Sequence, residues 1–322
     1  MTSSTVRVVP RLGGMVPPAA ALPEVLPTDR LLAGGKAVPE LRTPMRAIPN
    51  WRSAIAVLTV LAEPVVIIGG AIWLHHPVAW VAAFLLMGRS YARFASLGHE
   101  AVHRTLFSHK GINDWVGRWL LSYPSWVPFE QYRRAHLDHH RDEMGPKEPD
   151  IPLYVNYPIS RSSFRRKLWR DASGQTGWKL FKGLARAAVK RKPTAIRIFA
   201  CQVPIIAAFV AVGRPELYLL LWWLPHLTVW RVINRLRSIA EHGGMERSSD
   251  RRRTTHDVRQ SRLASFWLVP FNIGYHLAHH VDMGVNCWHL PDLQKELVAS
   301  GWVTNDYTYP TYRSLWKALA AG

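Results

Sequence analysis

The apolar residues of this chain are concentrated in four long stretches that occur as two pairs. They cover residues 54–74, 78–97, 195–212 and 217–233. Only a few residues separate the two members of each pair, at 75–77 and at 213–216. An α-helix needs about 20 apolar residues to cross a bilayer, so each stretch is long enough or nearly so. The pattern therefore predicts an all-α integral membrane protein whose four transmembrane helices form two hairpins.

Charged residues within the first pair add detail to this prediction. Glu63 and Pro64 interrupt the first stretch, and Arg89 and Arg93 lie near the end of the second. A carboxylate inside a membrane is costly to bury and usually faces protein. We therefore expect a kink in the first helix, with Glu63 turned toward the other helices. The two arginines are one turn apart and are expected to extend toward the lipid headgroups.

The segments outside these stretches differ in composition. Residues 1–50 contain eight prolines and no sustained periodicity, which predicts a disordered or loosely attached tail before a single domain at 51–322. Residues 115–129 are aromatic and broken by proline, which favours a segment at the membrane interface. Residues 161–193 are rich in arginine and lysine, which is typical of a cytoplasmic surface that faces a membrane.

The formal net charge of +19 would suit a nucleic-acid-binding protein. The 15 tryptophans and 23 prolines fit that class less well, so we expect no nucleic-acid partner. The two short connections within the hairpins hold one arginine between them. The positive-inside rule then places the tail, the long middle segment and the C-terminal segment in the cytoplasm, and with them both termini. The two cysteines, Cys201 and Cys287, form neither a disulfide framework nor a C-x-x-C site.

Three histidine clusters fall on this same side of the membrane. They are His99 and His103, then His136, His139 and His140, then His276, His279 and His280. The second and third clusters share the pattern H-x-x-H-H. Neutral imidazole is the commonest metal ligand among side chains. Eight such ligands exceed what one ion can use, so the pattern predicts two metal ions held almost wholly by nitrogen.

The first cluster also matches a different motif. His99-Glu100-Ala101-Val102-His103 has the spacing of the zinc peptidases, in which two histidines one turn apart bind zinc and the glutamate activates water. A membrane zinc metallopeptidase is therefore an alternative from another functional class. That hypothesis leaves both H-x-x-H-H clusters without a role, and short motifs often match by chance.

Taken together, the clusters resemble the histidine boxes of the membrane fatty acid desaturase and hydroxylase superfamily, whose members hold a non-haem di-iron centre. The resemblance covers about residues 50–300 and includes H-x-x-x-H after the second helix and H-x-x-H-H after the fourth. It extends to Asn272-Ile273-Gly274-Tyr275 before the third box and to Leu290-Pro291 after it. It implies four membrane helices beneath a cytosolic, histidine-rich helical cap. Many relatives have a proline-containing turn where this chain has residues 281–284, which leaves the substrate preference open.

The resemblance also implies the composition of the site. It adds His242, just after the fourth helix, as a ninth ligand of two Fe²⁺ ions; a surface histidine paired with Glu241 is the alternative for this residue. No catalytic residue beyond the metal centre is expected. Glu100, Asp138 and Glu241 are candidates for orienting the imidazole rings by hydrogen bonds. In relatives of the stearoyl-CoA type an asparagine also acts on one iron through a water molecule, and Asn234 and Asn272 are the candidates for it here.

The implied function is O₂-dependent desaturation of a fatty acyl chain linked to a lipid, to CoA or to an acyl carrier protein. Hydroxylation, ketolation or decarboxylation of a lipid or carotenoid are alternatives that the box spacing does not separate. Imidazole suits iron, zinc and copper alike, so iron follows from the resemblance alone. The chain has no ferredoxin cysteines and no nucleotide-binding glycine loop. Two electrons must therefore come from a separate donor, of the ferredoxin type or the cytochrome b5 type with its reductase.

Overall fold

The computed structural model describes residues 11–322 and is helical throughout. The first half contains η1 (Ala19–Ala21), α1 (Pro39–Met45), α2 (Asn50–Leu74), α3 (Pro77–His103), α4 (Lys110–Val116), η2 (Gly117–Ser122), α5 (Phe129–Arg141), α6 (Ile151–Tyr154) and α7 (Arg161–Ala172). The second half contains α8 (Gln175–Val189), α9 (Pro193–Ala211), η3 (Tyr218–Trp223), α10 (Leu224–Leu227), α11 (Val229–His242), η4 (Arg251–Arg253), α12 (Arg262–Trp267), α13 (His276–Val281), α14 (Leu290–Ala299) and α15 (Tyr312–Leu319). The β-structure of the described residues consists of two isolated bridges.

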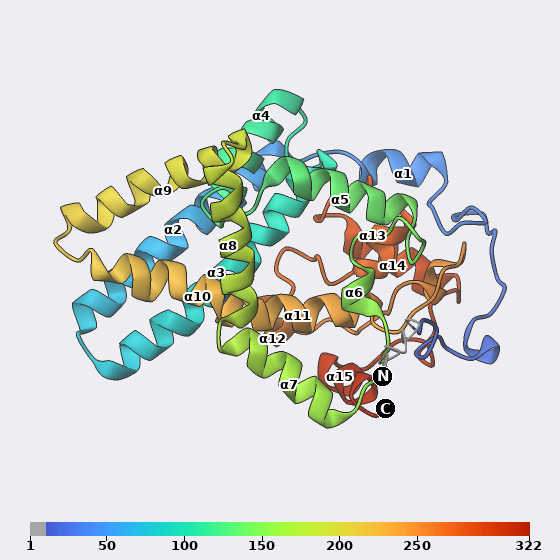
Figure 1. Cartoon of the computed structure of the whole chain (residues 1–322). Helices are drawn as coiled ribbons and strands as arrows, with labels where there is room; N and C mark the ends of the chain where they lie inside the picture. The colour runs from blue at the N-terminus through green and yellow to red at the C-terminus, as the bar shows by residue number, and fades with distance from the viewer. Residues whose placement is uncertain (1–10) are drawn as a thin grey trace.

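The apolar helices and the histidine helices occupy opposite ends of the molecule. Figure 1 shows α2, α3, α9 and α10 extending together toward one end, with α5, α13 and α14 gathered at the other. Two helices connect these regions, because α3 continues to His103 and α11 continues to His242. The ends of α3 and α11 therefore carry histidines out of the apolar region and into the cap.

A tight turn separates α2 from α3. His75 ends α2 in the left-handed conformation, with φ of 47°, and Pro77 starts α3. Proline suits the first helical position because the N–H it lacks would have no partner there. Apolar side chains such as Val60, Ile68 and Met87 then pack between the two helices in the main hydrophobic core.

Glu63 faces the other helices, as expected. Its carboxylate accepts a hydrogen bond from Arg93 Nη1 at 2.9 Å and also pairs with Arg89. Arg89 Nε donates to the carbonyl of Phe266 at 2.7 Å, which ties α12 to this network. The expectation that both arginines extend to the headgroups is wrong, because a buried carboxylate lies within their reach.

Two of the four predicted spans are long and apolar enough to cross a membrane, namely the segment Pro39–Leu74, which contains α2, and α9. The second predicted span forms part of α3, which is a single helix. The fourth, at 217–233, is divided among η3, α10 and α11, with Pro225 near the start of α10. The count of four spans stays a prediction.

Close packing sets the crossing of α3 and α11. A Cβ atom at Gly88 would lie 2.3 Å from Cβ of Val229, so only glycine permits this approach. A buried ion pair fixes α5 on the other side of α3. Arg133 Nη2 lies 2.5 Å from Asp114 Oδ1 and donates to the carbonyl of Ala101 at 2.7 Å. These contacts determine how the ends of α3, α5 and α11 meet.

The prediction of a disordered tail is wrong for residues 11–50; residues 1–10 lie outside the described part of the chain. Leu31 and Ala37 are each 1% exposed and pack in one core with Leu277 and residues of α14. Asp282, directly after α13, binds Arg42 Nε at 2.5 Å and Arg46 Nη2 at 2.6 Å. The segment has few helical residues of its own, so its order depends on partners far away in the sequence.

Candidate metal centre

Four helices bring the predicted histidines together. His99 and His103 end α3, three histidines lie on α5, three lie on the short helix α13, and His242 ends α11. Within α5 and α13, the i, i+3 and i+4 spacing of H-x-x-H-H places the three side chains of each box on one helix face. All nine are close to at least one other histidine of the set.

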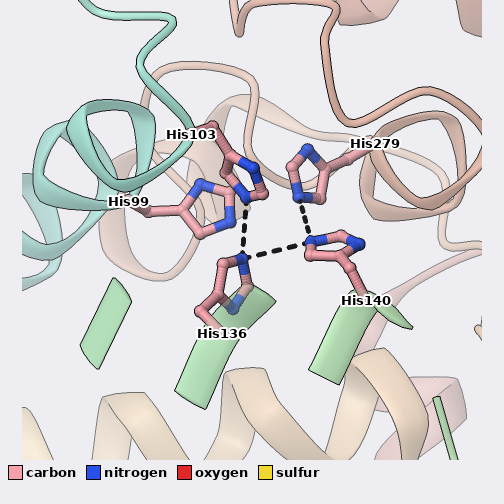
Figure 2. Close-up of side chains that lie close together, drawn as sticks. All are labelled: His99, His103, His136, His140 and His279. Atoms are coloured by element: carbon pink, nitrogen blue, oxygen red, sulfur yellow. Dashed lines mark hydrogen bonds between the residues drawn. The ribbon is translucent and has the colours of Figure 1, made fainter. Parts of the chain in front are cut away.

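One group of five histidines has its ring nitrogens within 4.8 Å of one another. It consists of His99, His103, His136, His140 and His279. Figure 2 shows the five rings pointing toward a common centre from three helices. The Nε2–Nε2 distances are 2.8 Å from His136 to His103, 3.2 Å from His140 to His136 and 3.0 Å from His279 to His140.

A second group adjoins the first. The ring nitrogens of His139, His242 and His280 also lie within 4.8 Å of one another. His276 belongs beside them, because its Nε2 is 3.0 Å from Nε2 of both His242 and His280. The histidines thus form one group of five and one of four, and each group has enough ring nitrogens to hold a metal ion.

The outward nitrogens of three histidines of the second group have acceptors, and Nδ1 of His276 has none among the described residues. His139 Nδ1 lies 2.6 Å from Glu148 Oε2, and His280 Nδ1 lies 3.0 Å from Glu143 Oε1. His242 Nδ1 lies 2.8 Å from the carbonyl of Thr254. A ring whose Nδ1–H donates outward presents a bare Nε2 lone pair inward, which is the form that binds a metal.

Burial keeps most of these rings neutral. It lowers the pKa of His103 to about 3 and that of His280 to about 3, although Glu143 opposes the shift of His280. His139 differs, because the hydrogen bond and charge of Glu148 outweigh burial and raise its pKa. Where neutral imidazoles present their Nε2 lone pairs to one another at about 3 Å, a cation between them relieves the repulsion of the lone pairs. The donor set therefore fits metal ions.

The five polar candidates around the ligands differ in position. Glu241 Oε1 lies 3.6 Å from His276 Nδ1 and also accepts from Arg237 Nε at 2.6 Å. Asn234 lines a cavity beside the histidines. Asp138 lies away from the centre, half exposed, and pairs with Arg141 at 2.8 Å. Asn272 donates instead to the carbonyl of Cys287 at 3.1 Å.

Glu100 does not face free solvent or an open site. Its Oε2 accepts from the backbone N–H of Cys287 at 3.0 Å and from Thr105 Oγ1 at 2.9 Å, and Oε1 lies 3.6 Å from His99 Nδ1. Burial raises the pKa of this carboxyl group to about 7. Glu100 thus links the end of α3 to the loop after α13. It is not placed to activate a water molecule as in a zinc peptidase.

Sequence reasoning missed three groups that hold the rings: Glu143, Glu148 and the carbonyl of Thr254. Glu143 is 4% exposed, and it also pairs with Arg251 and accepts from Thr255 Oγ1 at 3.0 Å. The sequence contains one indication of the two glutamates. Both follow the second box within nine residues, in a chain with only 22 acidic residues.

A cavity of about 260 Å³ lies directly beside the histidines. Its wall includes His136, His139, His242 and His276, together with residues of α3, α5, α6 and α11. A larger, apolar cavity of about 540 Å³ lies between α2 and α9 and contains no histidine in its wall. The smaller cavity is the one through which a molecule would reach the metal positions.

Comparison with known proteins connects this arrangement to a family. The sequence model for fatty acid desaturases matches residues 73–315. The dihydrorhizobitoxine desaturase of Bradyrhizobium elkanii is 24% identical over 245 residues, which is 69% of this chain and 68% of that protein. An sn-1 oleoyl-lipid 12-desaturase of Anabaena variabilis is 22% identical over 280 residues, 77% of this chain and 75% of that protein. An sn-1 acyl-lipid omega-3 desaturase (ferredoxin) of Synechocystis sp. is 27% identical over 99 residues, 31% of this chain and 25% of that protein.

Proposed function

The chain belongs to the fatty acid desaturase family, and from this premise we propose that it is a membrane-bound, O₂-dependent di-iron desaturase. As a member of that family it is an oxidoreductase. The observation that supports the di-iron part is the orientation of the rings: Nε2 atoms converge inside, while Nδ1 atoms of His139, His242 and His280 are held from outside.

The proposed ligands fall into the two groups described above. His99, His103, His136, His140 and His279 would hold one ion, and His139, His242, His276 and His280 the other. Two bound ferrous ions would supply the reduction of O₂ and the oxidising power to remove hydrogen from a saturated carbon. The overall reaction converts –CH₂–CH₂–, O₂, two electrons and two protons into –CH=CH– and two molecules of water.

The protein itself contributes positioning and exclusion of water. Glu143 and Glu148 hold the rings of His280 and His139 in one orientation, and burial keeps most of the other imidazoles, including that of His280, in the neutral, metal-binding form. The small cavity offers a substrate a place beside His136, His139, His242 and His276. The engaged carboxylate of Glu100 speaks against the peptidase alternative.

The two electrons are proposed to come from a separate protein. Helices α7 and α8 carry exposed basic residues such as Arg165, Arg166 and Lys182. An acidic donor of the ferredoxin type would be attracted to this surface. The reduction rate should then fall as the salt concentration rises, and a rate that is independent of salt would contradict this docking surface.

We place the histidine side of the protein and both termini in the cytoplasm, on the positive-inside rule. The sequence predicted a fatty acyl substrate, and that class remains a candidate because the Anabaena relative is named for an acyl lipid. The Bradyrhizobium relative is named for dihydrorhizobitoxine. Family membership therefore supports desaturation as the reaction. The substrate class has to be inferred from the residues that line the cavity.

Metal analysis and product profiling together test this function. Purified protein should contain two iron ions per chain, and His139→Ala should lose iron and activity. Cells that express the wild type should accumulate a product two hydrogens lighter than its precursor, in the lipid or the polar extract, and cells with His139→Ala should not. His289→Ala is a matched control, because His289 pairs with Asp292 outside the centre. One zinc per chain would contradict the proposal.

A further inference from the structure

The wall of the cavity beside the histidines combines apolar and charged side chains. Phe94, Leu153 and Trp230 are among the apolar ones. Besides the histidines, the charged and polar side chains come from α11, α5 and the segment around α6, and they include Arg231, Arg237, Glu241, Asp150, Asn234 and Tyr132. Pockets for apolar ligands are lined mainly by hydrophobic side chains with a few polar groups. Four charged side chains are more than such a pocket needs.

Several of these polar groups have no partner within residues 11–322. The carboxylate of Asp150, the carboxamide of Asn234 and the hydroxyls of Tyr132 and Tyr154 form no hydrogen bond with any described residue. The side chain of Arg231 contacts His226 alone, with Nε 3.2 Å from its carbonyl oxygen. Placing methylene groups here would leave these polar groups without partners, at a cost of about 1–3 kcal/mol for each.

The charges of the wall are unequally paired. Arg237 and Glu241 form an ion pair at 2.6 Å and neutralise each other. Arg231 and Asp150 form no ion pair with any residue that the structure describes. One basic and one acidic side chain of the cavity wall are therefore free of ion pairs with the described residues. A molecule that carries both a carboxylate and a donor group, such as an amine, would complement the two charges.

The apolar cavity between α2 and α9 is a separate candidate site for an acyl chain. Phe94 lies in the walls of both the polar cavity and the apolar cavity between α2 and α9. It packs against Trp222, with ring centroids 6.3 Å apart, and Tyr91 donates to the carbonyl of Trp222 at 2.6 Å. Phe94 thus lies where the two cavities adjoin, and the described wall of the apolar one contains no histidine.

The cavity beside the histidines shares Arg231 with a further cavity, whose wall is mostly apolar. Arg231 and Val127 also line a third cavity, of about 640 Å³, whose wall includes Gln131 and the exposed Lys192. Arg231 thus stands where this outer cavity meets the inner one. A small anion that enters past Lys192 would meet the guanidinium before it reaches the metal positions.

We infer that the substrate of this site is a small, polar molecule with a free carboxylate that binds Arg231, and with a donor group, such as an amine, that binds Asp150. The inference rests on the proposed desaturase function, since it names the molecule that would be desaturated. The bond that loses two hydrogens lies in the saturated part of this molecule. O₂ and two electrons from the donor protein complete the reaction as written under the proposed function.

Binding of six-carbon probes tests the inference without turnover. The probes are L-norleucine, hexanoate and hexylamine, and stearoyl-CoA is the lipid-like competitor. Binding of each is measured by equilibrium dialysis against iron-loaded, full-length protein in detergent. Norleucine and hexanoate should bind and hexylamine should not. Arg231→Gln should weaken norleucine binding by about 10- to 100-fold, as expected for loss of a charge-assisted hydrogen bond, whereas Arg231→Lys should retain part of it. Asp150→Asn should weaken binding of norleucine and leave hexanoate unaffected.

Arg166→Gln is the matched control, because it removes the same charge from an exposed position on α7. The inference is overturned if no carboxylate binds at millimolar concentration, if hexylamine binds as well as norleucine, or if Arg231→Gln changes nothing. Preferential binding of stearoyl-CoA would also overturn it and support an acyl substrate. Failure of the desaturase function would appear separately, as the absence of two iron ions or of donor-dependent O₂ consumption.

Discussion

Replacing Glu143 by glutamine tests how far the metal centre depends on residues outside the histidine set. The carboxylate is buried, lies 3.0 Å from His280 Nδ1 and 3.6 Å from His242 Nδ1, and accepts a hydrogen bond from Thr255. Glutamine keeps the size of the side chain and removes its charge. One face of the new amide is also a donor, which cannot accept a proton from a ring nitrogen.

The expected effect is confined to one metal position. Glu143 contacts two histidines of the second group and none of the first. Loss of such a partner weakens metal binding by about 10- to 100-fold. That factor corresponds to about 1.4–2.8 kcal/mol. We expect the variant to release one of its two metal ions at a chelator concentration 10- to 100-fold lower than the wild type, and to retain the other.

Iron per chain, measured during titration with a chelator, provides the assay, and circular dichroism checks that the helices persist. Glu246→Gln is the control, because Glu246 pairs with Arg253 and contacts no histidine. The reasoning is refuted if Glu143→Gln releases both ions at the wild-type chelator concentration. Simultaneous loss of both ions would show that the two groups are not independent.

Three further predictions concern the scaffold. Glu63→Ala should lower the stability in detergent by about 3–5 kcal/mol, because it leaves two buried arginines of α3 without their counter-charge; an unchanged melting temperature would refute this. Asp114 is partly buried, yet hydrogen bonds from Arg133 hold its pKa below the usual value. The ionised carboxylate therefore adds to the free energy of unfolding above about pH 4, and this contribution is lost as the pH falls through the lower pKa of the folded state. Asp114→Asn should remove this part of the acid sensitivity in denaturation curves. Gly88→Ala should destabilise by about 1–3 kcal/mol, while Gly69→Ala, with no heavy atom within 4 Å, should not, as thermal unfolding of both variants would establish.

The sequence predicted the parts of the molecule whose signal is local. Apolar stretches of about 20 residues identified α2, α3 and α9, because hydrophobic length is a property of contiguous residues. The spacing within each histidine box likewise places its members on one helix face. His242 has no such spacing and came from the family resemblance alone.

Other features depend on contacts that no single segment encodes. Glu143 holds rings from α13 and α11, and residues 11–50 are ordered by partners more than 230 positions away. The polar cavity was equally hidden, since Arg231 falls within a stretch that reads as a membrane helix. The stretch departs from α-helical geometry in the π-helical segment η3 and at Thr228, and Arg231 and Asn234 of α11 line the cavity.

The attachment of the N-terminal segment to Asp282 also bears on how the protein is made. Arg42 and Arg46 leave the ribosome long before Asp282, and α13 supplies three of the nine histidines. Contacts between such distant positions form late, because the closing of a long loop must precede them. The centre therefore cannot be complete on a nascent chain, and metal loading should follow release from the ribosome. Chains that terminate before residue 276 should be recovered without iron, however well their membrane helices insert.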